Sequence, residues 1–413
     1  MKSLPESARL KLELMFDGVR YSDALGKAAE HAFPNFYPYR FHEGEENPTG
    51  QPKATIPYLM AFDDGTMMRV KGNWKSPWKV VGDRARGYRL HNGDDIGSDL
   101  AIEFDPLPKW MQQQTSDGFP MAQAGVSLHG DMAVINIAPG CDYFLEKGAN
   151  GHSMRCSFCA YGAPNARVSH YQQVSGQPGL PDITYQRMKE TLSLALQDRA
   201  IGHIYLVAGS LTDWRLEADR FIEVARHVQE VNQHRVPVTC GSGALPKEKL
   251  LELHGLGLVD AVCFNLEIWG KDLFERVCPG KQKFVGYENW IQSLEDAVAL
   301  WGRGRVYSAM VAGIELEPEF EMNWEQAAKR AIEGADALCR KGIIPIYSLY
   351  WPTGGQDHPD YLSRLRNYFE RLNLEHHAIR QREGLEVWGG FMCHQCAYMQ
   401  MECDMDRAKA GDA

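Results

Sequence analysis

The chain has 413 residues, which fits either one large catalytic domain with added segments or two domains. Its 44% hydrophobic and 24% charged content is typical of a soluble globular protein, and no apolar run approaches the roughly 20 residues that cross a bilayer. The formal net charge of −10, without a concentrated Lys/Arg stretch, argues against binding to nucleic acid. We therefore expect a small-molecule substrate, no nucleic-acid partner and no membrane.

The first residues, MKSLPESARLKLELMFDG, place charges among the apolar positions and lack the apolar block of a secretory signal. This pattern predicts a cytoplasmic protein. The chain has 10 cysteines, and a cytosolic compartment keeps thiols reduced. We therefore expect the cysteines to serve metal or redox chemistry, in preference to a disulfide framework.

Residues 1–125 are predicted to form a small β-rich N-terminal cap. A short helix is expected near 5–15, followed by short strand-like runs such as 77–81 and 100–104. Within IPYLMAFDDGTMMRV, the dipeptide Asp64-Gly65 separates two apolar stretches, which is a strong local signal for a β-hairpin.

From about residue 130 the pattern changes to strands that alternate with helices. The predicted strands are too continuously apolar to have one face in water, which favours a buried parallel sheet. They cover 133–138, 203–209, 236–240, 260–267, 305–315 and 344–351, and the helices cover 183–197, 215–232, 246–255, 285–301, 323–341 and 357–380.

These elements predict an α/β fold with a partial (β/α)6 parallel barrel over residues 126–356, whose chemistry lies at the carboxyl ends of the strands. Residues 357–413 are then a C-terminal helix and a Cys-rich tail. An open doubly wound sheet is the alternative fold, but no G-x-G-x-x-G sequence follows the first strand.

Three cysteines follow the first predicted strand with the spacing C-x14-C-x2-C. They are Cys141, Cys156 and Cys159, and all three belong to one loop. Three thiolates bind three irons of a [4Fe–4S] cluster and leave the fourth iron open for another ligand. A zinc site or three unrelated buried thiols are the alternatives.

This segment resembles the cluster loop of the radical S-adenosylmethionine (radical SAM) superfamily. That family usually has C-x3-C-x2-C after the first barrel strand, with an aromatic residue just before the third cysteine, which is the place of Phe158. The first gap is longer here because of an insertion rich in Gly and Asn. Lengthening a flexible loop adds only a modest closure entropy, so its ends can still converge.

Four further segments resemble strand-end motifs that hold S-adenosylmethionine in this family. Ala208-Gly209-Ser210 keeps one glycine of a Gly-Gly-Glu-like turn but lacks its carboxylate. Asn265 and Glu267 alternate along a strand, so both point to one face, where they would bond the ribose hydroxyls. The cofactor-binding residues implied by the resemblance are Phe158, Gly209, Ser210, Asn265, Glu267, Gly313 and Pro352.

The resemblance implies reductive cleavage of S-adenosylmethionine to a 5′-deoxyadenosyl radical, which abstracts hydrogen from a small substrate. It also implies an electron donor, either a reductase or a flavodoxin-type protein. One alternative is a transferase that moves the 3-amino-3-carboxypropyl group of S-adenosylmethionine onto a thiophilic acceptor. Another is a non-catalytic protein that binds zinc or an iron–sulfur cluster.

A second group of thiols lies near the C-terminus in C-x2-C-x6-C spacing, at Cys393, Cys396 and Cys403. This density favours metal or metalloid binding. The candidates are a second iron–sulfur cluster, a Zn²⁺ site completed by His394 or a distant cysteine, or a thiophilic substrate such as trivalent arsenic. A reduced tail without a metal is the alternative. The remaining cysteines are expected to be buried hydrophobes without a functional role: Cys240, Cys263, Cys278 and Cys339.

Overall fold

The computed structural model of the chain covers its full length, and the residues that it describes are 3–21, 36–39, 54–57, 59–69, 72–73, 75–83, 85–93, 95–104, 107–136, 138, 140–159, 184–198, 201–350, 359–389 and 399–411. Within them, the main sheet has seven strands in the order β15-β14-β13-β12-β11-β10-β9. Their bounds are β9 Val126–His129, β10 Met132–Ile135, β11 His203–Val207, β12 Val238–Ser242, β13 Ala261–Phe264, β14 Val306–Ala312 and β15 Ile343–Leu349.

Strands β10 to β15 are parallel to their neighbours, as the alternation of strands and helices predicts. Every residue of β12 and β13 is buried, because helices cover one face and the interior of the curved sheet covers the other. Strand β9 was not predicted. It pairs antiparallel with β10 at the edge of the sheet, and only alternate residues of it are buried.

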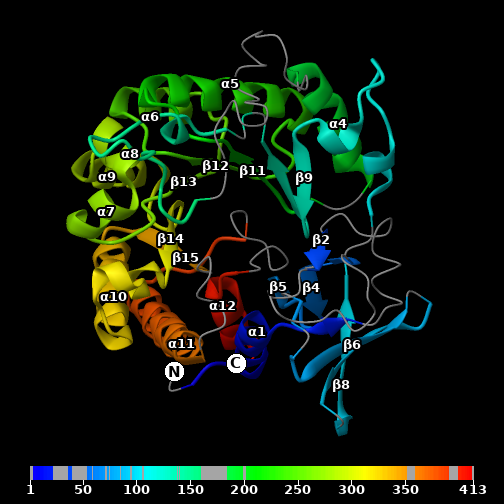
Figure 1. Cartoon of the computed structure of the whole chain (residues 1–413). Coiled ribbons are helices and arrows are strands. Elements are labelled where there is room, and N and C mark those ends of the chain that lie inside the picture. The colour runs from blue at the N-terminus through cyan, green and yellow to red at the C-terminus, as the bar shows by residue number, and fades with distance from the viewer. Residues whose placement is uncertain are drawn as a thin grey trace.

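Helices follow the strands and form an arc around the outside of the sheet (Figure 1). The result is a mixed α/β structure with a curled, half-barrel sheet. The helices are α4 Tyr185–Asp198, α5 Trp214–Asn232, α6 Lys247–Gly255, α7 Lys271–Val277, α8 Pro279–Phe284, α9 Tyr287–Trp301, α10 Trp324–Arg340 and α11 Pro359–Arg382. Short 3-10 helices occur at Lys109–Gln112, Met121–Gln123, Asp142–Phe144, Ile314–Leu316 and Pro318–Phe320.

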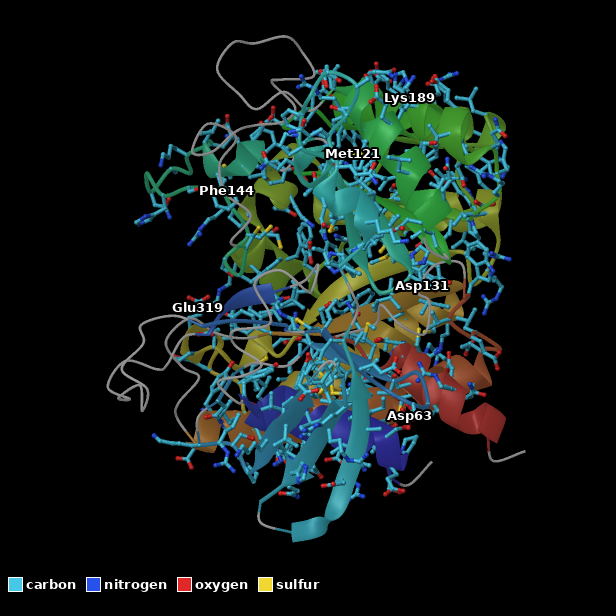
Figure 2. All side chains as sticks on the ribbon, turned by 90° about the vertical axis from the view of Figure 1, so that its right-hand side faces the viewer. Asp63, Met121, Asp131, Phe144, Lys189 and Glu319 are labelled. Carbon is cyan, nitrogen blue, oxygen red and sulfur yellow. The ribbon has the colours of Figure 1, made fainter. Side chains whose placement is uncertain are left out.

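The two ends of the half-barrel lie on opposite sides of the molecule in Figure 2. Phe144 follows β10 and Glu319 follows β14, and both lie on the left of the view. Asp131 precedes β10 and lies on the right. The carboxyl ends of the parallel strands therefore face one side, which is where the candidate site is found.

The N-terminal part forms a second sheet of six strands in the order β1-β6-β7-β8-β4-β5 within the described residues. The predicted hairpin is present, since β4 and β5 are antiparallel and Gly65 in their turn has a φ of 81°. The bounds are β1 Arg20–Tyr21, β4 Leu59–Phe62, β5 Met67–Arg69, β6 Trp78–Asp83, β7 Gly87–Asn92 and β8 Asp95–Glu103, and a separate pair is β2 Phe36–Tyr39 with β3 Ala54–Pro57.

The N-terminal helix α1, Glu6–Asp17, connects the two sheets. Leu12 and Met15 pack into the core of the half-barrel, whereas Leu14 packs into the core of the second sheet. On α1, Lys11 has a fully buried side chain, and its Nζ lies 2.6 Å from Asp404 Oδ2. Asp404 belongs to helix α12, Glu402–Gly411, which was predicted only as part of a Cys-rich tail.

Helix α12 is also fixed to the last strand of the half-barrel. The Glu402 side chain accepts a 2.8 Å hydrogen bond from the backbone N–H of Tyr347 in β15. Arg380 Nη1 of α11 lies 2.6 Å from Asp406 Oδ2 of α12. The two ends of the chain are thus joined to the half-barrel through buried charged groups. None of the described helices has an apolar stretch that would allow it to cross a membrane.

Replacing Lys11 by Met leaves the Asp404 carboxylate buried without the ammonium group that contacts it. We expect the free energy of unfolding to fall by about 3 kcal/mol, measured by denaturant titration. The double variant Lys11→Met/Asp404→Leu removes both charges and should regain more than half of that loss. The single variant Asp404→Leu completes the comparison. If the double variant loses as much free energy of unfolding as the two single variants lose together, the buried pair does not join α1 to α12.

Candidate active site

The loop after β10 folds back on itself, and this fold brings its cysteines together. Cys141 precedes the 3-10 helix Asp142–Phe144. Residues 146–154, here called the insertion hairpin, then form a narrow turn. Met154 N–H donates to Glu146 O at 3.0 Å, Gly148 N–H donates to His152 O at 2.9 Å, and Lys147 faces Ser153. The long gap between Cys141 and Cys156 is therefore an ordered excursion whose ends meet.

The same loop is bonded to the junction of α7 and α8. Ser157 N–H donates to Val277 O and Gly280 N–H donates to Met154 O, both at 2.9 Å. Tyr143 stacks on Phe284 with their ring centroids 5.6 Å apart. A Cβ at Gly280 would lie 2.6 Å from Tyr143 Cγ, so the close approach of α8 requires glycine there. These contacts fix the loop relative to β13, which precedes α7.

A cavity of about 220 Å³ lies between this loop and the carboxyl ends of β11, β12 and β13. It contains all three thiols of the predicted cluster motif. The residues that line it are Cys141, Tyr143, Cys156, Phe158, Cys159, Tyr205, Val207, Ala208, Gly209, Ser210, Gly241, Ser242, Gly243, Asn265, Glu267 and Lys281. Loop and strand ends thus form one site.

The three thiols have different surroundings. Burial raises the pKa of Cys141 to about 12. A hydrogen bond from the Cys278 thiol, by contrast, lowers the pKa of the buried Cys156. Cys278 was predicted to be a buried hydrophobe; it is buried, and it also contacts a residue of the cluster motif. Cys159 is half-buried, and its carbonyl accepts a 3.2 Å hydrogen bond from Arg155.

The three thiols suit the donor set of an iron–sulfur cluster. A [4Fe–4S] cluster takes one thiolate at each of three irons, so three thiols that line one cavity fit it. Among the residues that the structure describes, no group of three His, Cys, Asp or Glu side chains is arranged to hold a single metal ion.

The end of β11 approaches the cluster loop without space for a side chain. A Cβ at Gly209 would overlap Gly140 O, and Asp142 N–H donates to Ser210 O at 2.9 Å. The buried Glu217 of α5 holds this region by accepting hydrogen bonds from Leu211 N–H at 2.9 Å and Gly243 N–H at 2.8 Å. Burial raises the pKa of Glu217. A glycine at position 209 is therefore a geometric requirement.

The end of β13 carries a buried ion pair that faces the cavity. Lys281 Nζ lies 2.7 Å from Glu267 Oε1 and also donates to the backbone carbonyl of Asn265. Burial alone would lower the pKa of Lys281, but the Glu267 carboxylate and the Cys156 thiol raise it above its usual value. The ammonium group therefore keeps its charge beside the thiols and fixes both predicted residues of this strand end.

Other predicted site residues lie elsewhere. Gly313 does not line the cavity; its N–H donates to the Glu315 carboxylate at 3.1 Å, and a Cβ there would overlap Leu365. Cys403 is buried in the core at α12. Pro352, Cys393 and Cys396 lie outside the described residues. The roles predicted for Gly313, Cys403 and these three residues stay predictions.

Several cavity residues were not identified from the sequence. Lys281 stands within PGKQ after α7, and nothing in that spacing indicates that α8 turns back under β13. Tyr205 and Ser242 lie in apolar strands, where an inward-facing polar side chain cannot be distinguished from one that packs in the core. A polar residue at the carboxyl end of a parallel strand is the only signal that would have found Ser242.

No family model matches the chain. A curated protein, bacteriochlorophyllide c C-7(1)-hydroxylase of Chlorobaculum limnaeum, is 22% identical over 279 residues, which cover 64% of this chain and 65% of the relative's length. This similarity supports the resemblance of the chain to the radical SAM superfamily. A solved radical SAM methyltransferase from Sphaerobacter thermophilus is 14% identical, with a TM-score of 0.37 and coverage of 78% of this chain and 81% of that one.

Replacing Lys281 by Met removes the ammonium group that fixes Asn265 and Glu267 at the cavity. We expect the dissociation constant for S-adenosylmethionine to rise about tenfold, the equivalent of one buried charged hydrogen bond. Isothermal titration of reconstituted protein measures it. The matched control is Lys283→Met, because Lys283 is exposed on the same helix. Equal affinities in the two variants would exclude this positioning role.

Proposed function

We propose that this chain is a radical SAM enzyme, which binds a [4Fe–4S] cluster through Cys141, Cys156 and Cys159 and binds S-adenosylmethionine in the adjoining cavity. It then uses a 5′-deoxyadenosyl radical to abstract hydrogen from a small-molecule substrate. The observation that carries this proposal is a single cavity lined by three thiols and by the ends of three parallel strands. Three thiolates leave one iron of the cluster for the cofactor.

A cluster held by these thiols would supply one electron for the cleavage of S-adenosylmethionine to methionine and the 5′-deoxyadenosyl radical. The chain's own residues bind and orient the cofactor. Gly209 lets the end of β11 approach the cluster loop closely, and Phe158, which stands between Cys156 and Cys159 in the sequence, lines the cavity. The buried positive charge of Lys281 lies beside Cys156 and favours its thiolate form.

Glu267 completes this arrangement from the other side of the ion pair. Its backbone is fixed on β14, because its N–H donates to Ala309 O at 2.9 Å and its carbonyl accepts from Val311 N–H at 2.7 Å. Its φ of 74° is unusual for a residue with a side chain. Strain of this kind persists where the surroundings fix the backbone, and it is common at ligand-binding positions.

The relative named above is a hydroxylase that acts at a carbon position of its substrate. That activity supports hydrogen abstraction from carbon as the reaction class of this chain. Transfer of a 3-amino-3-carboxypropyl group is the competing reaction, and it would break a different carbon–sulfur bond of the same cofactor. The nucleoside that is released therefore distinguishes the two reactions.

Anaerobic protein reconstituted with iron and sulfide should release 5′-deoxyadenosine when it is given dithionite and S-adenosylmethionine. The single variants Cys141→Ala, Cys156→Ala and Cys159→Ala should each reduce this release at least 100-fold, because two thiolates cannot hold the cluster in place. Chromatography of the quenched reaction measures the nucleoside.

Cys240→Ala is the matched control, since Cys240 is fully buried in β12 and does not line the cavity. It should retain cleavage. Release of 5′-methylthioadenosine in place of 5′-deoxyadenosine would show that the reaction is group transfer and not hydrogen abstraction. Full activity in any of the three cysteine variants would refute the cluster assignment.

A further inference from the structure

The insertion hairpin gives the cluster loop a surface of its own. The exposed residues at positions 144–157 include Leu145, Lys147, His152 and Arg155. The one acidic residue of this segment is Glu146, whose side chain is 39% exposed. Leu145 has 43% of its surface exposed, which is unusual for a large apolar side chain in this protein. Figure 2 shows Phe144 at the outer side of the molecule, on the face to which the parallel strands point.

The positive charges of this surface are held in place by contacts. The Arg155 guanidinium lies 5.6 Å from the ring centroid of Phe144 and donates to Cys159 O. Lys283 of α8 lies 4.8 Å above the ring of Phe284 and 3.6 Å from Glu146 of the hairpin. Cations that stack on rings keep their charge at the surface while their stems cover apolar area.

This local charge contrasts with the charge of the whole chain. The formal net charge is −10, so the protein as a whole repels acidic proteins. Lys147, Arg155 and Lys283 are all exposed and lie on the loop or helix that contacts the thiols. A basic area with an exposed leucine on the cluster loop, in a chain whose net charge is negative, attracts an acidic partner at that one place.

We propose that the insertion hairpin, together with Lys283, is the docking surface for an acidic flavodoxin-type electron carrier. The inference rests on the proposed function, which needs one electron per turnover. In that step the reduced flavin of the carrier loses one electron and the [4Fe–4S] cluster gains it, while no bond forms or breaks and no proton moves.

The position of the surface suits this transfer. Arg155 directly precedes Cys156 and its guanidinium donates to the carbonyl of Cys159, so a partner that contacts Arg155 lies near two of the proposed cluster ligands. Electron transfer slows steeply with distance, which favours a dock at this loop over one behind the helices. Complexes of this kind are small and weak, and opposite charges accelerate their formation.

The test compares the double variant Lys147→Glu/Lys283→Glu with Lys329→Glu/Arg340→Glu. The control changes the net charge equally on α10, where the two side chains are 74% and 66% exposed. Nucleoside release is measured with dithionite, which needs no docking surface, and with reduced flavodoxin. The hairpin variant should keep its rate with dithionite and lose about tenfold with flavodoxin at low ionic strength. The control should keep both rates.

A binding measurement makes the result independent of turnover. Titration of reconstituted protein with oxidised flavodoxin should show weaker binding only for the hairpin variant, and the difference should shrink in high salt because ions screen exposed charges. The single variant Lys147→Gln should lose less affinity for flavodoxin than the hairpin double variant and more than the control.

Equal binding and equal flavodoxin-driven rates for the two double variants would overturn the proposed docking surface. It would also be overturned if the hairpin variant lost as much of its rate of nucleoside release with dithionite as with flavodoxin. Absence of nucleoside from the unmodified protein with dithionite refutes the proposed function instead, and the titration then still decides whether the carrier docks here.

Discussion

The candidate site depends on the backbone hydrogen bonds that return the chain from Cys141 to Cys156. The insertion hairpin closes on itself, and the segment that follows it is hydrogen-bonded through Met154 to Gly280 of α8 and through Ser157 to Val277 of α7. Without these bonds the entropy of a loop of this length would oppose the meeting of the three thiols. Because the same bonds fix α8, they also place Lys281 under the end of β13. One set of contacts therefore builds both the thiol side and the charged side of the cavity.

The cavity and the strand ends beside it contain groups that are individually unfavourable to bury. Glu217, Glu267 and Lys281 are each buried or nearly so, and each is satisfied by a specific partner. A buried charge contributes little net stability, because desolvation offsets much of the attraction. The proposed binding of S-adenosylmethionine, which is a charged cofactor, would give the buried charges at the strand ends a role. The same logic does not extend to Lys11 and Asp404, which join two helices away from the cavity.

The sequence predicted those features that are local. Continuous apolar runs indicated the parallel strands, and the spacing of Cys141, Cys156 and Cys159 indicated that one loop carries the three thiols that line the cavity. It did not predict α12, because that helix is fixed by Lys11 and Tyr347, which are far from it along the chain. The role of Lys281 was not predicted for the same reason. Its position follows from the packing of α8 against the cluster loop, which is far from it along the chain. Strand β9 is short and its apolar and polar residues alternate, as in the strands of the N-terminal sheet. Its pairing with β10 could therefore not be assigned from the sequence.

The central claim is that three thiols hold a cluster whose fourth iron is open to the sulfonium cofactor. Mössbauer spectroscopy of protein reconstituted with ⁵⁷Fe, recorded with and without S-adenosylmethionine, tests it directly. The account predicts a [4Fe–4S] spectrum in which one of the four irons changes its parameters when the cofactor is added. A spectrum without such a cluster, or four irons that do not respond to the cofactor, would contradict it.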